Sequence, residues 1–290
     1  MTDPAPQAPT AFDPAAVARQ FVTARLGARA LSAFPGPLPP DMAAGYRAQE
    51  AAIGLWREPI IGWKVGRIPA DLQTELGAAR LMGPVFAGHL WIADSAAPTP
   101  LPVISGGFAA VEAEYVFRIG RDAPADKLKW TPDEALEFAG DLLVGVEFAG
   151  SPLATINVLG PRVVASDFGN NAGLIVGRPV PNWRQRPDLI PPCRAYVADV
   201  LVGEGSPADV PGGPQASLAF LLGACAARGR PLQAGQFVTT GAASGIHEIE
   251  AGQSARIVFG ELDEIRCVAV PAAPAGDRGG EDHDDNGRAD

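Results

Sequence analysis

Residues 111–119 read VEAEYVFRI, and the architecture to expect follows from this stretch. Every second residue from Val111 to Ile119 is apolar, which predicts a β-strand with one buried face. The other face carries Glu112 and Glu114, whose Cα atoms lie about 7 Å apart at this spacing. Two such carboxylates can converge on one cation, and without a cation they repel each other. The alternative is the solvent-facing polar side of an antiparallel sheet.

A third carboxylate lies in the next apolar run, LLVGVEFA at residues 142–149. This run predicts a strand buried on both faces, so Glu147 needs a cation, a hydrogen-bond donor or a raised pKa. An arginine partner would serve as well as a metal ion. Because carboxylates offer only oxygen ligands, a metal bound by Glu112, Glu114 and Glu147 would be Mg²⁺ or Mn²⁺ rather than zinc.

Lys64 presents the same problem with the opposite charge, because residues 60–65 (IIGWKV) are otherwise apolar. A buried ammonium needs an anion nearby. It can bind a substrate carboxylate, or act as a base if burial lowers its pKa. The alternatives are a structural salt bridge and a lysine that protects an edge strand from aggregation.

Outside these segments, the pattern predicts an α+β fold with a curved, largely antiparallel β-roll behind a helical N-terminal region. Apolar periodicity predicts helices at residues 14–29, 40–56, 132–139 and 216–228, and strands at 59–65, 110–119, 142–148, 193–202 and 256–270. We predict a disordered leader at 1–12, a helical region at 13–57, a catalytic β-roll domain at 58–271 and a disordered acidic tail at 272–290.

The overall composition narrows the class of protein. The 290 residues are 47% hydrophobic and carry a net charge of −10, and no run of Lys and Arg suits nucleic acid. We see no apolar stretch of about 20 residues for a bilayer crossing, and no signal peptide. Three cysteines without C-x-x-C spacing favour a reducing compartment. We therefore expect a cytoplasmic protein without a nucleic-acid or membrane partner.

Two loops are weaker candidates for substrate contacts. Thr240 and Gly241 end a short apolar run, where backbone N–H groups can meet an anion. Asn170 and Asn171 can donate to a substrate oxygen, although an ordinary turn explains either loop. No Ser or Cys has an identifiable His base, which disfavours nucleophilic hydrolysis.

Taken together and in order, these motifs resemble the 2-keto-4-pentenoate hydratases of the fumarylacetoacetate hydrolase superfamily. The resemblance spans about residues 15–270, and no single motif in it is specific. Its parts are GWKVG at 62–66, VEAE at 111–114, Glu147, GGP at 212–214, LQAGQ at 232–236 and Thr240-Gly241.

The resemblance implies a distorted β-roll or barrel, an oligomer of identical subunits, and Mg²⁺ or Mn²⁺ held by Glu112, Glu114 and Glu147. The resemblance also implies a lyase that has a small 2-oxo acid as its ligand. This lyase would be a hydratase that adds water to 2-hydroxypenta-2,4-dienoate through a metal-stabilised enolate, as in the catabolism of aromatic compounds. Lys64 matches the active-site lysine. The same scaffold also serves 2-oxo acid decarboxylases and acylpyruvate C–C hydrolases, and a catalytically inactive metal- or ligand-binding homologue is the alternative of another class.

Three departures from the family pattern concern charged residues. The family's Pro-Asp-aromatic-Gly stretch is here residues 80–84 (RLMGP), without a carboxylate. Its Asp-Ser-Arg is Gly150-Ser151-Pro152, and its Asp-Asn-Ala loop is matched to Asn170-Asn171-Ala172. We therefore expect a divergent site that has lost a proton-transfer group near Leu81 and a supporting Asp and Arg near Gly150.

Overall fold

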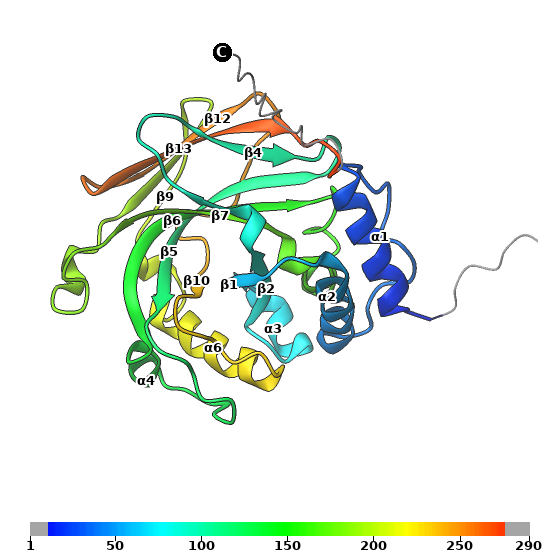
Figure 1. Cartoon of the computed structure of the whole chain (residues 1–290), viewed down its shortest axis with the longest axis horizontal. Helices are drawn as coiled ribbons and strands as arrows, with labels where there is room; N and C mark the ends of the chain where they lie inside the picture. The colour runs from blue at the N-terminus through cyan, green and yellow to red at the C-terminus, as the bar shows by residue number, and fades with distance from the viewer. Residues whose placement is uncertain (1–10, 276–290) are drawn as a thin grey trace, which may run out of the picture.

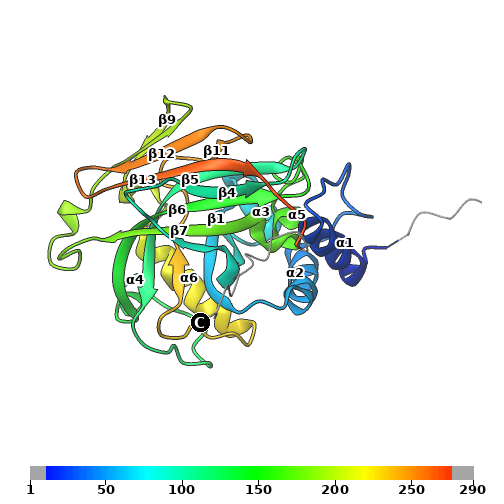
Figure 2. The same cartoon turned by 45° about the horizontal axis from the view of Figure 1, so that its top comes forward.

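The computed structural model describes residues 11–275, which form two curved sheets with helices along their margins (Figures 1 and 2). The helices are α1 (Pro14–Leu26), α2 (Met42–Trp56), α3 (Ala70–Leu76), α4 (Pro132–Leu136), α5 (Pro161–Ser166) and α6 (Pro214–Ala227). Within residues 11–275 no helix has both the length and the apolar character that a bilayer crossing requires.

The larger sheet has eight strands and carries the quoted stretch at its centre. Its order is β2-β1-β10-β5-β6-β7-β3, and β11 also pairs with β5. The bounds are β1 (Ile60–Arg67), β2 (Arg80–Phe86), β3 (Leu90–Ile92), β5 (Phe108–Ile119), β6 (Ala139–Ser151), β7 (Asn171–Pro179), β10 (Phe237–Thr239) and β11 (His247–Glu248).

The smaller sheet has five strands in the order β4-β13-β12-β8-β9. They are β4 (Thr99–Val103), β8 (Cys193–Val197), β9 (Val200–Gly205), β12 (Ser254–Phe259) and β13 (Asp263–Pro271). The apolar face of β5 packs toward this sheet: the rings of Tyr115 and Phe259 lie 6.0 Å apart, and the Tyr115 hydroxyl donates to the carbonyl of Pro191. Because side chains alternate along a strand, Glu112 and Glu114 lie on the opposite face of β5.

The two N-terminal helices form as the sequence predicts, because aspartates cap both. The Asp13 side chain accepts hydrogen bonds from the first backbone N–H groups of α1, and Asp41 does the same for α2. Val17 and Phe21 of α1 share a buried cluster with Phe108 of the sheet. The helices thus pack on the edge of the roll (Figure 1).

Several predicted boundaries were wrong, two of them because a hairpin turn divides the predicted strand. The run 193–202 is two strands, since Ala198 and Asp199 have φ of 47° and 63° and reverse the chain. The run 256–270 likewise divides into β12 and β13 around Gly260, with φ of 51°. The first helix ends at Leu26 instead of Arg29, and α4 ends at Leu136 because residue 139 already begins β6.

The predicted leader and tail lie mostly outside the described residues. Residues 1–10 and 276–290 are not described, so disorder there stays a prediction. At the inner ends the prediction was wrong: Phe12 stacks on Phe34, Ala272 donates its backbone N–H to Val103, and that of Ala275 bonds to Leu26. The domain boundary near residue 57 also stays a prediction.

Candidate active site

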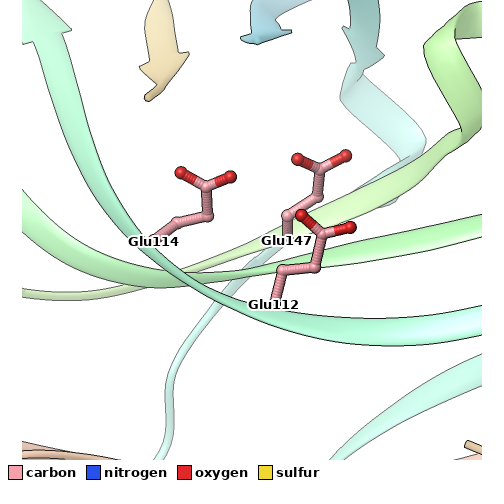
Figure 3. Close-up of side chains that lie close together, drawn as sticks. All are labelled: Glu112, Glu114 and Glu147. Atoms are coloured by element: carbon pink, nitrogen blue, oxygen red, sulfur yellow. The ribbon is translucent and has the colours of Figure 1, made fainter. Parts of the chain in front are cut away.

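The β5–β6 pairing brings the three glutamates together. Glu112 and Glu147 are direct partners in this antiparallel ladder, and Glu114 stands opposite Gly145. One carboxylate oxygen from each glutamate lies within 4.8 Å of the others, and all three side chains point into one space (Figure 3). Their exposed fractions are 4%, 0% and 0% for Glu112, Glu114 and Glu147. The alternative of a solvent-facing polar strand is therefore wrong.

Glu147 is the most extensively paired of the three. The Lys64 ammonium lies 3.1 Å from Glu147 Oε1. The two residues therefore form a buried ion pair, in which each charge has the partner that its burial requires. The Asn171 amide donates to the same oxygen at 3.2 Å, and the Thr239 hydroxyl donates to Oε2 at 3.4 Å. Three groups, from β1, β7 and β10, thus converge on the carboxylate of Glu147 in β6.

Glu114 is held by the backbone of the loop after β10. The N–H groups of Thr240 and Gly241 donate to its Oε2 at 2.9 and 2.7 Å. Gly241 has φ of +110°, a conformation that side chains disfavour, so glycine is required to aim both amides at the carboxylate. The expected anion at this loop is therefore a glutamate of the protein itself.

Two oxygens of the cluster lack partners. Among the described residues, no hydrogen-bond donor reaches Glu112 Oε1 or Glu114 Oε1, although both atoms are buried. A buried carboxylate oxygen without a hydrogen bond costs free energy of folding. Carboxylate oxygens are also the ligands that a hard divalent cation prefers. Three carboxylates and one ammonium leave a net charge near −2, which one divalent ion would neutralise. These residues therefore fit such an ion.

Without a cation, burial and crowding shift the ionisation of the site. Burial first, and then the charge of Glu147, raise the pKa of Glu112 to about 8. The same causes, joined by Glu112, raise the pKa of Glu114 well above its ordinary value. Burial would lower the pKa of Lys64, but the charges of Glu147, Glu112 and Glu114 outweigh burial and raise it. Lys64 is therefore a protonated ammonium in this arrangement. Its pKa is not lowered, as it would have to be for the side chain to act as a base.

A strained loop delivers the two asparagines. Phe168, Gly169 and Asn170 all have positive φ, of 53°, 64° and 55°. The loop touches β2 so closely that a Cβ on Gly83 would meet the Phe168 carbonyl oxygen at 1.8 Å. As a result, Asn170 Oδ1 accepts a hydrogen bond from Lys64 at 3.1 Å. The Lys64 ammonium is thus held by Asn170 of this loop and by Glu147 of β6.

Arg25 and Asp167 form a buried ion pair that anchors this loop, and no spacing rule in the sequence connects the two residues. Asp167 accepts from Arg25 Nε at 2.7 Å and from the Ser151 hydroxyl at 2.6 Å, and Arg25 also donates to the Gly150 carbonyl. The expectation that the site lacks an Asp and an Arg near Gly150 was wrong. Asp167 and Arg25 supply them from distant positions, and only their charge in apolar surroundings could have indicated this.

The site opens into a cavity of about 810 Å³. Lys64, Glu112, Asn170, Thr240 and Gly241 line the cavity, whereas Glu114, Glu147 and Asn171 lie behind this lining. Asn171, expected to bind substrate, bonds instead to Glu147 and to the Gly173 carbonyl. Leu81 lines the cavity where the family pattern has an acid, and among the described lining residues the carboxylates are Glu112 and Asp209.

Comparison with known proteins identifies the fold. The sequence matches no family model and no curated protein. The structure resembles 4-oxalocrotonate decarboxylase from Pseudomonas putida G7, solved with calcium and acetate and with magnesium and adipate, with a TM-score of 0.72 and 18% identity over 89% of this chain and 97% of that chain. It also resembles fumarylpyruvate hydrolase from Pseudomonas aeruginosa, solved with Mn²⁺ and pyruvate, with a TM-score of 0.53 and 18% identity over 74% of this chain and 91% of that chain.

These structural neighbours are members of the fumarylacetoacetate hydrolase superfamily. The α+β fold expected from the sequence, a fumarylacetoacetate hydrolase-like β-roll with marginal helices, is thereby confirmed. At 18% identity the likeness concerns the fold, and it does not distinguish hydratase from decarboxylase or hydrolase.

Proposed function

We propose that this chain is an enzyme that uses Mg²⁺ or Mn²⁺ to transform a small 2-oxo acid. The observation that carries the proposal is the convergence of Glu112, Glu114 and Glu147 within 4.8 Å beside Lys64. The unpartnered oxygens of Glu112 and Glu114 support a bound cation in particular. Superfamily members solved with divalent metals share the fold, which agrees with the proposal.

The three glutamates would hold the cation, with the Thr240 and Gly241 amides fixing the orientation of Glu114. When bound, the ion would supply positive charge that stabilises the negative charge developing on a 2-oxo oxygen. The chain provides the remaining groups. Thr240 and Gly241 also line the cavity, so their loop positions the ligand end nearest the carboxylates.

Lys64 is the candidate catalytic residue. Its ammonium is held by Glu147 and Asn170 at 3.1 Å each and lines the cavity, so it can bind a substrate carboxylate or deliver a proton. Leu81 lines the cavity with Lys64 and offers no second acid. Proton transfer is therefore assigned to Lys64 and to water.

The reaction that we propose is the addition of water to 2-hydroxypenta-2,4-dienoate or a similar dienoate, giving a 4-hydroxy-2-oxo acid. Decarboxylation of a 2-oxo acid and C–C hydrolysis of an acylpyruvate are the alternatives, since each also develops charge on the 2-oxo oxygen. The direct test follows the ultraviolet absorbance of the dienoate after the protein and Mg²⁺ are added. Absorbance should fall, and chelation should stop the decrease.

Lys64→Met provides the matched variant for this assay. We expect turnover to fall at least about 100-fold, since loss of a proton-transfer group typically costs 10²–10⁴-fold. Cation affinity should not fall, because a competing positive charge has been removed from Glu147. Equal turnover by parent and variant would remove Lys64 from the mechanism. Cation binding without turnover of dienoates, 2-oxo diacids or acylpyruvates would identify a metal-binding protein that lacks catalysis.

A further inference from the structure

Gln49 of α2 is a fully buried polar side chain that the proposed mechanism does not use. Its Nε2 donates to the carbonyl of Met82 and to the carbonyl of Ala165, each at 2.9 Å. Arg228 Nη1 donates to its Oε1 at 2.7 Å, so the amide nitrogen must face the two carbonyls. One side chain therefore joins two separate segments of backbone, β2 and the end of α5.

The two carbonyl groups lie beside the contact between β2 and the strained loop Phe168–Asn170. Met82 belongs to β2, and a Cβ on Gly169 would lie only 3.1 Å from the Met82 carbonyl oxygen. Ala165 lies in the last turn of α5, from which the chain enters the loop. Gln49 therefore fixes the start of the loop relative to the strand that the loop touches.

This contact sets the position of the Lys64 partner. Asn170 accepts a hydrogen bond from the Lys64 ammonium at 3.1 Å, and Lys64 stands opposite Gly83 in the β1–β2 ladder. Lys64 thus moves with β2, whereas Asn170 moves with the loop. A shift of the loop away from β2 would separate the two side chains.

Protection of a sheet edge does not explain Gln49. Strand β2 is at the edge of its sheet, and the Tyr46 hydroxyl accepts from the Met82 N–H at 3.1 Å on this side. Cover for the edge requires contacts with β2 alone. The second hydrogen bond from Gln49, to Ala165, instead ties α5 to β2. A buried amide with both donors engaged holds such a junction in one arrangement.

We infer that Gln49 is a positioning residue for Lys64, which acts by holding the loop that carries Asn170 against β2. The inference rests on the proposed function, because it is there that Lys64 is the candidate catalytic residue. Gln49 is not among the described residues that line the cavity, so it does not touch the substrate. Its effect reaches the site through Asn170.

The first test measures how fast acetic anhydride labels Lys64 in the full chain with Mn²⁺ present, by mass spectrometry. The chain has three lysines, Lys64, Lys127 and Lys129, and the exposed Lys129 is the internal standard. Gln49→Met keeps the length of the side chain and removes both donors. We expect Lys64 labelling relative to Lys129 to rise at least about tenfold, because two buried carbonyls lose their donor and the loop opens more often.

Ile257→Ala is the matched control, because it opens a cavity in β12 of the smaller sheet and leaves α2 unchanged. Lys64 labelling in this variant should stay within about twofold of the parent. If Gln49→Met does not fold, Arg228→Gln takes its place, since it releases Gln49 Oε1 and should raise Lys64 labelling by about twofold or more. Labelling of Lys64 at the parent rate in the Gln49 or Arg228 variant, or an equal rise in Ile257→Ala, would overturn the inference.

The second test uses turnover, which a merely structural role would not change in a folded variant. In the dienoate assay, kcat of Gln49→Met should fall about 10- to 100-fold, as expected for a displaced catalytic group. Its affinity for Mn²⁺ should stay within about twofold of the parent, because the contacts of Glu114 and Glu147 are kept. An unchanged kcat would overturn the inference even if labelling rises. Faster labelling in Gln49→Met, together with a parent that turns over no substrate, would contradict the proposed function and leave the link between Gln49 and Lys64 intact.

Discussion

Glu112→Gln should change how the stability of the metal-free protein depends on pH. In the folded chain, burial and the charge of Glu147 raise the pKa of Glu112 from 4.5 to about 8. The folded state therefore binds a proton more tightly than the unfolded state between these values. Stability from this source is fully present below pH 4.5 and is lost as pH rises to 8. At about 1.4 kcal/mol per pH unit, the loss is about 5 kcal/mol.

The assay is urea unfolding followed by circular dichroism, with a chelator present, at several pH values from 4.5 to 8. We expect Glu112→Gln to gain on the parent by up to about 5 kcal/mol over this range, because the glutamine is never ionised. Glu261→Gln, at an exposed position, is the matched control and should track the parent. Addition of Mn²⁺ should abolish most of the parent's loss. Parallel pH profiles of parent and Glu112→Gln would refute the proposed electrostatic crowding.

Two further predictions concern the elements that position the site. Asp167→Asn should destabilise the fold by about 3–5 kcal/mol in urea unfolding, because Arg25 is left buried without its partner. The matched change Asp188→Asn, in an exposed pair, should have little effect, and equal effects of the two changes would contradict the anchoring role. Gly241→Ala should lower the free energy of unfolding by about 1–3 kcal/mol and weaken Mn²⁺ binding in calorimetry, because φ of +110° strains an alanine and displaces the amides from Glu114. The control Gly54→Ala, in α2, should be neutral or stabilising. Unchanged Mn²⁺ binding in Gly241→Ala would count against the role of the loop.

The sequence indicated the central strand and the chemistry of its glutamates because both are local signals. Alternation over residues 111–119 predicts β5 and the shared face of Glu112 and Glu114. Glu147 and Lys64 were predicted to be buried because charge in an apolar run is conspicuous. What local pattern could not give is the ladder register, which makes Glu112 and Glu147 direct partners and brings Lys64 to 3.1 Å from Glu147.

Long-range pairing also explains what the sequence missed. Arg25 and Asp167 are 142 residues apart, so no spacing rule connects them. Attention to Asn170 and Asn171 left out Asp167, whose carboxylate binds Arg25 and Ser151. The turn at Ala198 and Asp199 was not predicted, because neither the Ala-Asp pair nor the length of the run 193–202 is as strong a turn signal as Asn-Gly.

The central claim is that Glu112, Glu114 and Glu147 hold one divalent cation, and titration calorimetry with Mn²⁺ on the chelator-treated protein tests it most directly. The parent and Glu261→Gln should each bind one ion per chain, and Glu147→Gln should lose most of that affinity because a ligand charge is removed. Glu147→Gln binding Mn²⁺ as tightly as the parent, or a parent that binds no ion, would contradict the account.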